Sequence, residues 1–277
     1  MTTEATRFLE KRITSIPGWF STQDYQVFIT LMDQQSISGV TGDVLEIGTY
    51  LGKSAALLGA LLAEGEELYV CDLFSESTNE MNRTENEKSY PDLQRSMFEK
   101  NYQKVNNCLP QILENSSLDL ESKLPHHTFR FIHIDGSHLY PFVKSDLRFA
   151  INHLVAIGGI IVMDDFRAQH ALGVSKCVWE AILSFELVPL VVSAAKIYLV
   201  KSGDSNFDLG LLANSLRVNG FDTENLDLFE HNSIRVLGAD DGFLYSNENS
   251  LRQLVPPFFL PLLQKIRYYF RTLRKIL

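Results

Sequence analysis

The chain has 277 residues, with 25 lysine and arginine residues against 34 aspartate and glutamate residues and a net charge of −9. This length suits one large domain or one domain with additions, and a composition of 45% hydrophobic and 21% charged residues is that of a folded globular protein. An acidic chain has the wrong charge to coat nucleic-acid phosphates, so we expect no nucleic-acid partner. Three cysteines are too few for a disulfide framework or a Cys-rich zinc site, and neither a signal peptide nor a membrane-spanning run is readable, which predicts a cytoplasmic protein.

The hydrophobic pattern predicts a helical cap followed by an α/β domain. Residues 5–38 place apolar side chains at helical spacing and are interrupted at Pro17 and Gly18, so we expect two helices in a cap over residues 1–40. Short apolar runs then alternate with helical patterns, with strands expected at 43–47, 68–72, 129–134 and 159–163 and helices at 54–63, 142–154 and 175–185. This alternation is typical of a doubly wound, Rossmann-like, mostly parallel sheet, which we assign to residues 41–202.

The end of the predicted sheet differs from its beginning. Only four residues separate the apolar runs 187–192 and 197–200, which permits a hairpin and forbids a helical crossover, so one strand near the C-terminal end should be antiparallel. The long polar segment 75–104 follows the second strand and is a candidate lid. Residues 203–277 form a C-terminal extension, in which 203–250 has no strong periodicity and could serve as a surface extension or an oligomer contact.

A glycine-containing segment, EIGTYLGKS at residues 46–54, joins the first predicted strand to its helix. Gly48 and Gly52 let the backbone approach a ligand closely, and the helix N-terminus offers unpaired N–H donors. The spacing is neither GxGxxG nor that of a P-loop, and a tight turn that binds nothing is the alternative. Asp72 ends the next strand, where a carboxylate accepts hydrogen bonds from ribose hydroxyls, although it could instead cap a turn.

A second constellation predicts a metal site. Asp135 and His138 follow one predicted strand, and Asp164 with Asp165 follows the next, so all four open onto the edge of the sheet that carries the glycine turn. Neighbouring carboxylates repel one another unless a cation neutralises them, and oxygen ligands without cysteine favour Mg²⁺, Mn²⁺ or Ca²⁺. The alternative is that these acids cap helices or accept loop N–H groups.

The histidines divide into one candidate base and one candidate core residue. His138 lies in the loop after its strand and titrates in the range of a general base. His133 lies within the strand and is interpreted as a packed core histidine. The remaining histidines, at 126, 127, 153, 170 and 231, show no comparable constellation.

The segments DVLEIGTYLGKSA, VCDLF, FIHIDGSHLYPFVKSDL and GGIIVMDDF together resemble the class I S-adenosylmethionine-dependent methyltransferases, and among them the metal-dependent sugar O-methyltransferases of the macrocin and mycinamicin type. The resemblance covers residues 40–201. It implies S-adenosylmethionine at the glycine segment and Asp72, Mg²⁺ or Mn²⁺ held by Asp135, Asp164 and Asp165, and His138 as the base. Its cofactor-binding positions here are Glu46, Gly48, Thr49, Tyr50, Gly52, Ser54 and Asp72, with Ser116 and Ser117 near the adenine. Asp164 departs from the family, which often has glutamate there.

The resemblance implies methyl transfer to a hydroxyl of a sugar, polyol or glycoconjugate. Two rival methyltransferase-fold functions are a catechol-type phenolic O-methyltransferase, for which Trp19, Phe20 and Tyr140 are candidate aromatic clamp residues, and a non-catalytic scaffold. A nicotinamide oxidoreductase would share the sheet but needs a tighter glycine loop.

The last 27 residues, 251–277, carry six basic and no acidic residues. Leu262, Ile266, Tyr269, Phe270, Leu273 and Leu277 recur at helical spacing among the basic residues, which predicts a basic amphipathic helix. Its apolar face could pack on the domain or on a second subunit of a homo-oligomer. Peripheral contact with an anionic membrane is the other interpretation.

Overall fold

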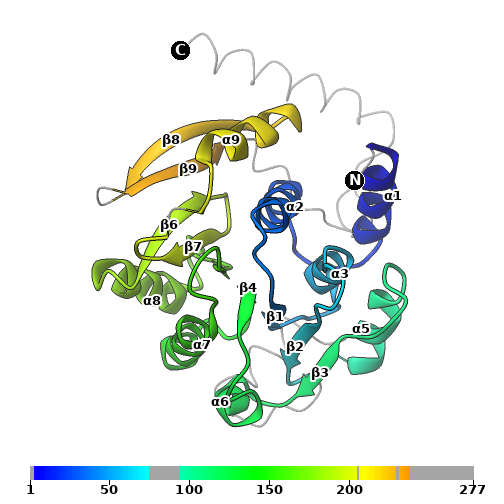
Figure 1. The fold of residues 1–277 in the computed structure, drawn as a ribbon. Coiled ribbons are helices and arrows are strands. Elements are labelled where there is room, and N and C mark those ends of the chain that lie inside the picture. The colour runs from blue at the N-terminus through cyan, green and yellow to red at the C-terminus, as the bar shows by residue number, and fades with distance from the viewer. Residues whose placement is uncertain (1–2, 75–93, 205, 229–230, 238–277) are drawn as a thin grey trace, which may run out of the picture. The chain divides into compact units, whose positions relative to one another are not determined.

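The computed structural model describes residues 3–74, 94–204, 206–228 and 231–237. Within them the chain forms a nine-stranded sheet in the order β3-β2-β1-β4-β5-β7-β6-β9-β8 (Figure 1). The strands are β1 Asp43–Ile47, β2 Leu68–Asp72, β3 Gln111–Glu114, β4 Phe129–Ile134, β5 Ile160–Met163, β6 Leu187–Val192, β7 Ile197–Lys201, β8 Asp222–Leu228 and β9 His231–Leu237. The strands expected from the apolar runs are therefore present at their predicted places.

The topology is the mixed, mostly parallel one that the sequence predicts. β1 pairs in parallel with β2 and β4, and β5 adds in parallel to β4. β7 runs antiparallel between β5 and β6, as the four-residue gap between β6 and β7 requires. The carboxyl ends of β1, β2, β4 and β5 therefore share one edge of the sheet.

The sheet extends further than the sequence predicts. β9 pairs in parallel with β6, and β8 pairs antiparallel with β9. In the described sheet β7 and β8 therefore run opposite to the other strands, where the sequence predicts one such strand, and part of the segment 203–250 is strand. Most β8 side chains are exposed or half-buried, because β8 is an edge strand and its polar sequence DTENLDL carries little apolar signal. The short β3, at the opposite edge, was missed for the same reason.

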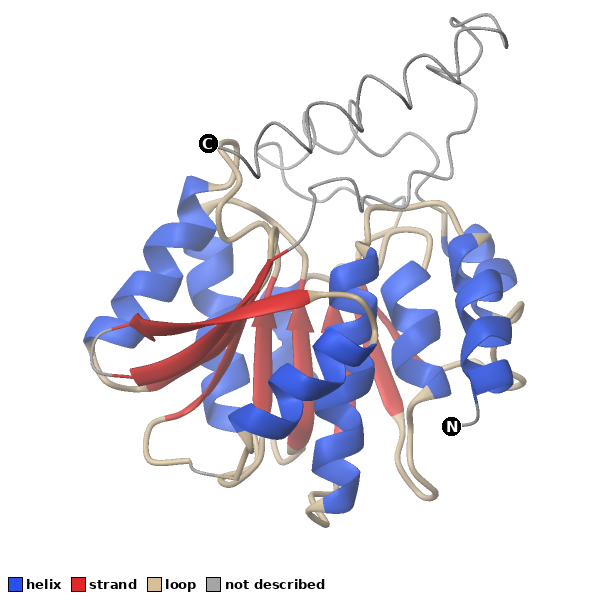
Figure 2. Cartoon of the chain, turned by 90° about the horizontal axis from the view of Figure 1, so that it is seen from above, coloured by secondary structure: helices blue, strands red, loops and turns tan. Residues whose placement is uncertain are grey.

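Helices cover both faces of the sheet (Figure 2). They are α1 Thr3–Thr14, α2 Thr22–Ile37, α3 Lys53–Ala60, α5 Arg95–Tyr102, α6 Leu120–Lys123, α7 Tyr140–His153, α8 Leu172–Leu183 and α9 Leu209–Val218, with a 3₁₀ turn η1 at Ser117–Asp119. Two apolar clusters form, one between the sheet and helices α1, α2, α3, α5 and α9, the other between the sheet and α6, α7 and α8. The result is a three-layer α/β/α arrangement.

The two N-terminal helices are present, and α2 packs directly on the sheet. Phe28 of α2 makes edge-to-face contacts with Phe131, His133 and Tyr198 on β4 and β7. Ser21 caps α2 by accepting a hydrogen bond from the backbone N–H of Asp24, as Ser at an N-cap commonly does. The segment leading into α2 is thereby held against the central strands.

Two predictions fall outside the described residues: the basic amphipathic helix at 251–277 and most of the candidate lid at 75–104, of which α5 is described. Among the helices of the described residues, none combines the length and apolar character needed to cross a membrane.

Candidate active site

The glycine segment is shaped by its contact with the neighbouring strand. Gly48 follows β1 with φ +81°, and a Cβ added to it would lie 2.1 Å from the carbonyl oxygen of Asp135. Gly52 is the N-cap of α3, with φ +86°, and a Cβ added to it would lie 2.8 Å from the ring of Phe98. Both glycines are therefore required by the fold itself, which keeps the loop backbone tight against the end of β4.

Two effects of replacing Gly48 on the free energy of unfolding can be measured separately: the steric clash with Asp135 and the cost of a left-handed backbone. Gly48→Ala should lower the free energy of unfolding by about 3 kcal/mol or more, because the methyl group adds a steric clash to an unfavourable φ. Gly65→Ala is the matched control, because Gly65 has φ +85° with nothing within 4 Å of its Cβ, so only the backbone cost of about 1–2 kcal/mol remains. Denaturant titration measures both variants, and equal losses would contradict the clash.

Asp72, at the end of β2, points into the glycine segment. Its Oδ2 accepts hydrogen bonds from the backbone N–H groups of Thr49 (2.7 Å) and Tyr50 (3.1 Å), and its Oδ1 accepts one from the N–H of Phe74 (2.9 Å). Burial raises the pKa of Asp72, although these hydrogen bonds act in the opposite direction. Asp72 thus orders the loop, as the capping interpretation holds.

Two predicted metal ligands meet where β4 and β5 end. Ligand atoms of Asp135, Asp164 and His133 all lie within 4.8 Å of one another. Burial and the charge of Asp164 raise the pKa of Asp135 well above its usual range. Burial also acts to raise the pKa of Asp164, but the ammonium of Lys196 outweighs it and holds that pKa below its usual value. The structure thus places Lys196 among the carboxylates, although no pattern in the sequence marks this lysine.

Lys196 and His133 form part of a buried polar chain beneath the cluster. The Lys196 ammonium pairs with Asp164 Oδ2 and lies 3.2 Å from His133 Nε2, and His133 Nδ1 lies 2.7 Å from Glu46 Oε1. Burial raises the pKa of Glu46 to about 8 and lowers that of His133 to about 3. His133 is fully buried, as predicted, and both its ring nitrogens are engaged, so Asp135 and Asp164 remain the candidate ligands of this group.

Asp165 belongs to a second group, with two histidines. Its Oδ2 lies 3.1 Å from His138 Nε2 and 3.5 Å from His170 Nε2, and the two imidazole rings are 5.0 Å apart. Burial acts to raise the pKa of Asp165, but the hydrogen bond from His138 and the charges of His138, His170 and Lys196 together hold it below its usual value. Asp165 has φ +54°, so the strand has ended there. His170, which lies in the loop before α8, was missed because its neighbours in sequence carry no metal-ligand or catalytic pattern.

The remaining predicted residues belong to α3, η1 and the segments that carry the aromatic candidates. Ser54 is buried in the first turn of α3, and Ser116 caps η1, its Oγ accepting a hydrogen bond from the N–H of Leu118 at 3.3 Å. Ser117 begins η1. Of the candidate clamp residues, Phe20 is buried and Tyr140 donates a hydrogen bond to Glu180, whereas the half-exposed Trp19 stacks on Tyr50 at 5.3 Å.

The donor set fits a hard divalent cation. Asp135 and Asp164 offer adjacent carboxylate oxygens, and Asp165 is near enough for its charge to raise the pKa of Asp135. Three carboxylates and the Lys196 ammonium carry a formal charge of −2 together, which one divalent cation would balance. Magnesium and manganese prefer carboxylate oxygens of this kind.

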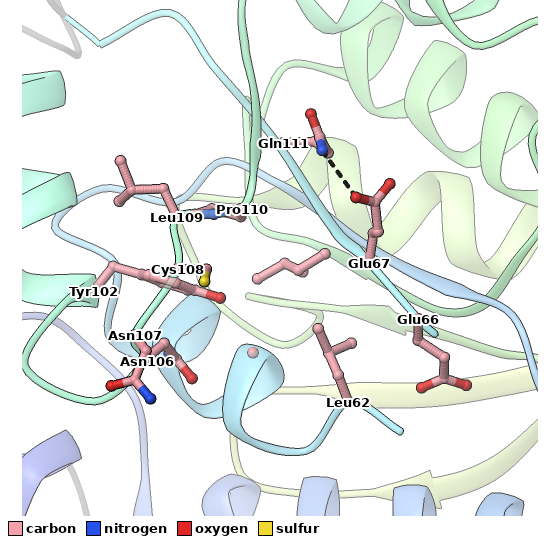
Figure 3. A pocket seen from close by; sticks show the side chains of 12 residues that line it. Leu62, Glu66, Glu67, Tyr102, Asn106, Asn107, Cys108, Leu109, Pro110 and Gln111 are labelled. Atoms are coloured by element: carbon pink, nitrogen blue, oxygen red, sulfur yellow. Dashed lines mark hydrogen bonds between the residues drawn. The ribbon is translucent and has the colours of Figure 1, made fainter. Parts of the chain in front are cut away.

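A surface pocket of about 280 Å³ lies elsewhere (Figure 3). Its lining includes Glu67, Leu68 and Gln111, which lie where β2 and β3 begin, at the opposite ends of these strands from Asp72. Gln111 donates a hydrogen bond to Glu67 across it at 3.0 Å. None of the predicted catalytic, cofactor-binding or metal-binding residues lines this pocket.

Comparisons with known proteins agree with the fold. Residues 45–166 match a family model described as a methyltransferase domain. The O-methyltransferase NovP has a similar fold, with a TM-score of 0.53, 16% identity, and coverage of 65% of this chain and 80% of that chain. Cofactor-bound Rv0187 from MTB has a TM-score of 0.50 at 15% identity, covering 73% of this chain and 91% of that chain. No curated protein sequence matches the chain.

Proposed function

We propose that this chain, whose residues 45–166 match a methyltransferase-domain family model, is a class I methyltransferase that transfers a methyl group from S-adenosylmethionine to a hydroxyl oxygen of a sugar, polyol or glycoconjugate, with the help of a divalent metal. One observation carries this proposal. The proposed cofactor and metal residues all lie at the carboxyl ends of neighbouring parallel strands. They are the glycine segment, Asp72, Asp135, His138, Asp164 and Asp165. That edge is where open α/β sheets bind their ligands.

The cofactor half of the proposal concerns residues 46–54 and Asp72. The N–H groups of Thr49 and Tyr50 are bonded to Asp72, and Gly52 is the N-cap of α3. The loop would therefore offer its carbonyl oxygens, and α3 its first N–H groups, to the methionine and ribose of the cofactor. Asp72 would accept from the ribose hydroxyls in addition to its loop partners, since a carboxylate has about four acceptor sites. Glu46, Ser54, Ser116 and Ser117 are proposed to complete the cofactor site.

Asp72→Ala should weaken binding of S-adenosylhomocysteine by about 1.5–3 kcal/mol, because ribose hydroxyls lose a charged acceptor and the loop loses its anchor. Isothermal titration calorimetry measures the affinity. Asp222→Ala, on an exposed position of β8, is the control and should leave it unchanged. An unaltered affinity in Asp72→Ala would contradict the proposed ribose site.

The catalytic half concerns the carboxylates and His138. Asp135, Asp164 and Asp165 are the proposed ligands of Mg²⁺ or Mn²⁺, a Lewis acid that lowers the pKa of a bound hydroxyl. When Nε2 of His138 donates to Asp165 (3.1 Å), its Nδ1 is the basic nitrogen. His138 Nδ1 would then accept the hydroxyl proton as the oxygen attacks the methyl group, while Asp165 keeps the ring oriented.

The position of the aromatic residues supports a sugar-type acceptor over a phenolic one. A phenol is gripped between aromatic faces, yet Phe20 is buried beneath Lys196 and Tyr140 lies on α7 with its ring covered by Lys176. Trp19 is 45% exposed and stacks on Tyr50, with the ring centroids 5.3 Å apart.

A labelled-methyl transfer screen tests the function directly. Purified protein is incubated with methyl-labelled S-adenosylmethionine and separate panels of sugars, glycolipids and phenols, each with and without Mg²⁺. We expect transfer to a sugar or glycolipid that depends on Mg²⁺. Transfer to phenols alone would support the catechol-type alternative, and cofactor binding without transfer to any acceptor would support a scaffold.

A further inference from the structure

Lys196 is a lysine in a place where lysine is rarely found. It belongs to the four-residue turn between β6 and β7, a position that normally leaves the side chain in water, yet its side chain is only 2% exposed. A charged group buried in this way is costly unless it is paired. The free-energy cost of burying the ammonium indicates that it is stabilised by the carboxylates that it contacts.

The turn that carries Lys196 is tied to the loop after β5. Lys196 N–H donates to Ser193 Oγ at 2.9 Å, and the N–H of Phe166 donates to the carbonyl of Ala195 at 3.0 Å. The guanidinium of Arg167 adds hydrogen bonds to the carbonyls of Ser193 and Ala194, each at 2.9 Å. These contacts hold the backbone of Lys196 next to the segment that contains Asp164 and Asp165.

The ammonium is also held from its far side. His133 Nε2 accepts from it at 3.2 Å, and the ring of Phe20 lies beneath it with its centroid 5.6 Å away. Because Nε2 accepts, His133 carries its proton on Nδ1 and donates it to Glu46 at 2.7 Å. Asp164 is fixed in turn, since its Oδ2 pairs with Lys196 and its Oδ1 accepts from the N–H of Asp165 at 2.7 Å.

We propose that Lys196 is a fixed internal cation of the metal site, which orients Asp164 and limits how tightly the cluster binds a divalent cation. The proposal rests on the metal-dependent function proposed above. The ammonium shares Asp164 with the metal and reduces the charge of the three carboxylates from −3 to −2. Its repulsion of a second cation a few ångströms away is large in a partly buried site, so it should weaken metal binding by about tenfold or more.

Binding of Mn²⁺ tests this proposal without relying on turnover. Mn²⁺ is titrated into the full-length protein, and the concentration of unbound Mn²⁺ is measured by electron paramagnetic resonance. The dissociation constants of wild type and Lys196→Met are then compared. We expect Lys196→Met to bind Mn²⁺ at least about tenfold more tightly, because the repulsive charge is gone. Lys176→Met is the matched control: Lys176 lies on α8, 58% exposed beside Glu180, and its loss should leave Mn²⁺ affinity unchanged.

Two further variants separate charge from packing. Lys196→Arg keeps the positive charge, so its Mn²⁺ affinity should stay within a few-fold of that of wild type. If the lysine were purely structural, Mn²⁺ affinity would not depend on the charge at this position. Lys196→Gln is the second neutral variant should Lys196→Met fail to fold, and retained S-adenosylhomocysteine binding reports folding. Equal or weaker Mn²⁺ binding by a folded neutral variant overturns the proposal. Failure of the proposed metal dependence appears differently, as wild-type turnover that survives chelation.

Discussion

His138→Ala is expected to lower the rate of methyl transfer by about 10²–10⁴-fold, the usual contribution of a positioned general base. The reason lies in the geometry of His138, whose Nε2 is 3.1 Å from Asp165 Oδ2, so that the carboxylate orients the ring and favours the tautomer that accepts a proton on Nδ1. Single-turnover measurement of labelled-methyl transfer at saturating acceptor reports the chemical step. The affinity for S-adenosylhomocysteine should stay the same, since His138 is not proposed to touch the cofactor.

His170→Ala is the internal control for this result. His170 shares Asp165 with His138 but is 64% exposed and 3.5 Å from the carboxylate, so its loss should slow the reaction far less than the loss of His138. A large effect in His170→Ala together with a small effect in His138→Ala would reverse the two roles. Near-normal turnover in both variants would remove the histidine base from the mechanism.

Chelation is expected to produce the second large effect. Treatment with EDTA should reduce turnover by about 10²-fold or more, because Asp135, Asp164 and Asp165 would no longer hold the Lewis acid that activates the acceptor hydroxyl. Restoring Mg²⁺ or Mn²⁺ should restore the activity. Binding of S-adenosylhomocysteine should persist, because the glycine segment and Asp72 do not belong to the candidate metal-binding groups.

Asp135→Asn tests the same site without a chelator. Burial and the neighbouring carboxylates raise the pKa of Asp135, so an amide should be tolerated by the fold while it weakens the proposed metal site. We expect loss of Mn²⁺ affinity and of turnover in this variant, and neither loss in Asp222→Asn on exposed β8. Full activity in excess EDTA would refute the metal assignment and leave the three aspartates as structural residues.

Much of the fold could be predicted because its central strands are buried on both faces. β4, with sequence FRFIHI, is buried at every position and reads as an uninterrupted strand. Polar residues mark the ends of the strands, since Asp72 is the last residue of β2 and aspartates follow β4 and β5 directly. The edge strands could not be predicted in this way, since β8 leaves most of its side chains in contact with water. A local apolar pattern exists only where the sheet excludes solvent.

The candidate site divides along the same line. Asp72, Asp135, His138, Asp164 and Asp165 could be selected because each follows an apolar run, and parallel strands bring such ends to one edge. Only the tertiary structure divided the predicted metal ligands into two groups, one with Asp135 and Asp164 and one with Asp165, His138 and His170. The direction of a side chain after a strand ends depends on loop conformation, such as φ +54° at Asp165, which the sequence pattern does not specify.

By itself the sequence determined the order of the central strands with their helices and the carboxylate-rich edge of the sheet, because both follow from local periodicity and from where apolar runs stop. The tertiary structure alone decided that Lys196 is a buried counter-ion and that His133 links it to Glu46. Lys196 and His133 are 63 positions apart in the chain, and Glu46 and His133 meet only because β1 and β4 pair in one register. A lysine in a turn is solvated unless distant strands close around it, and that closure is a property of the packed sheet.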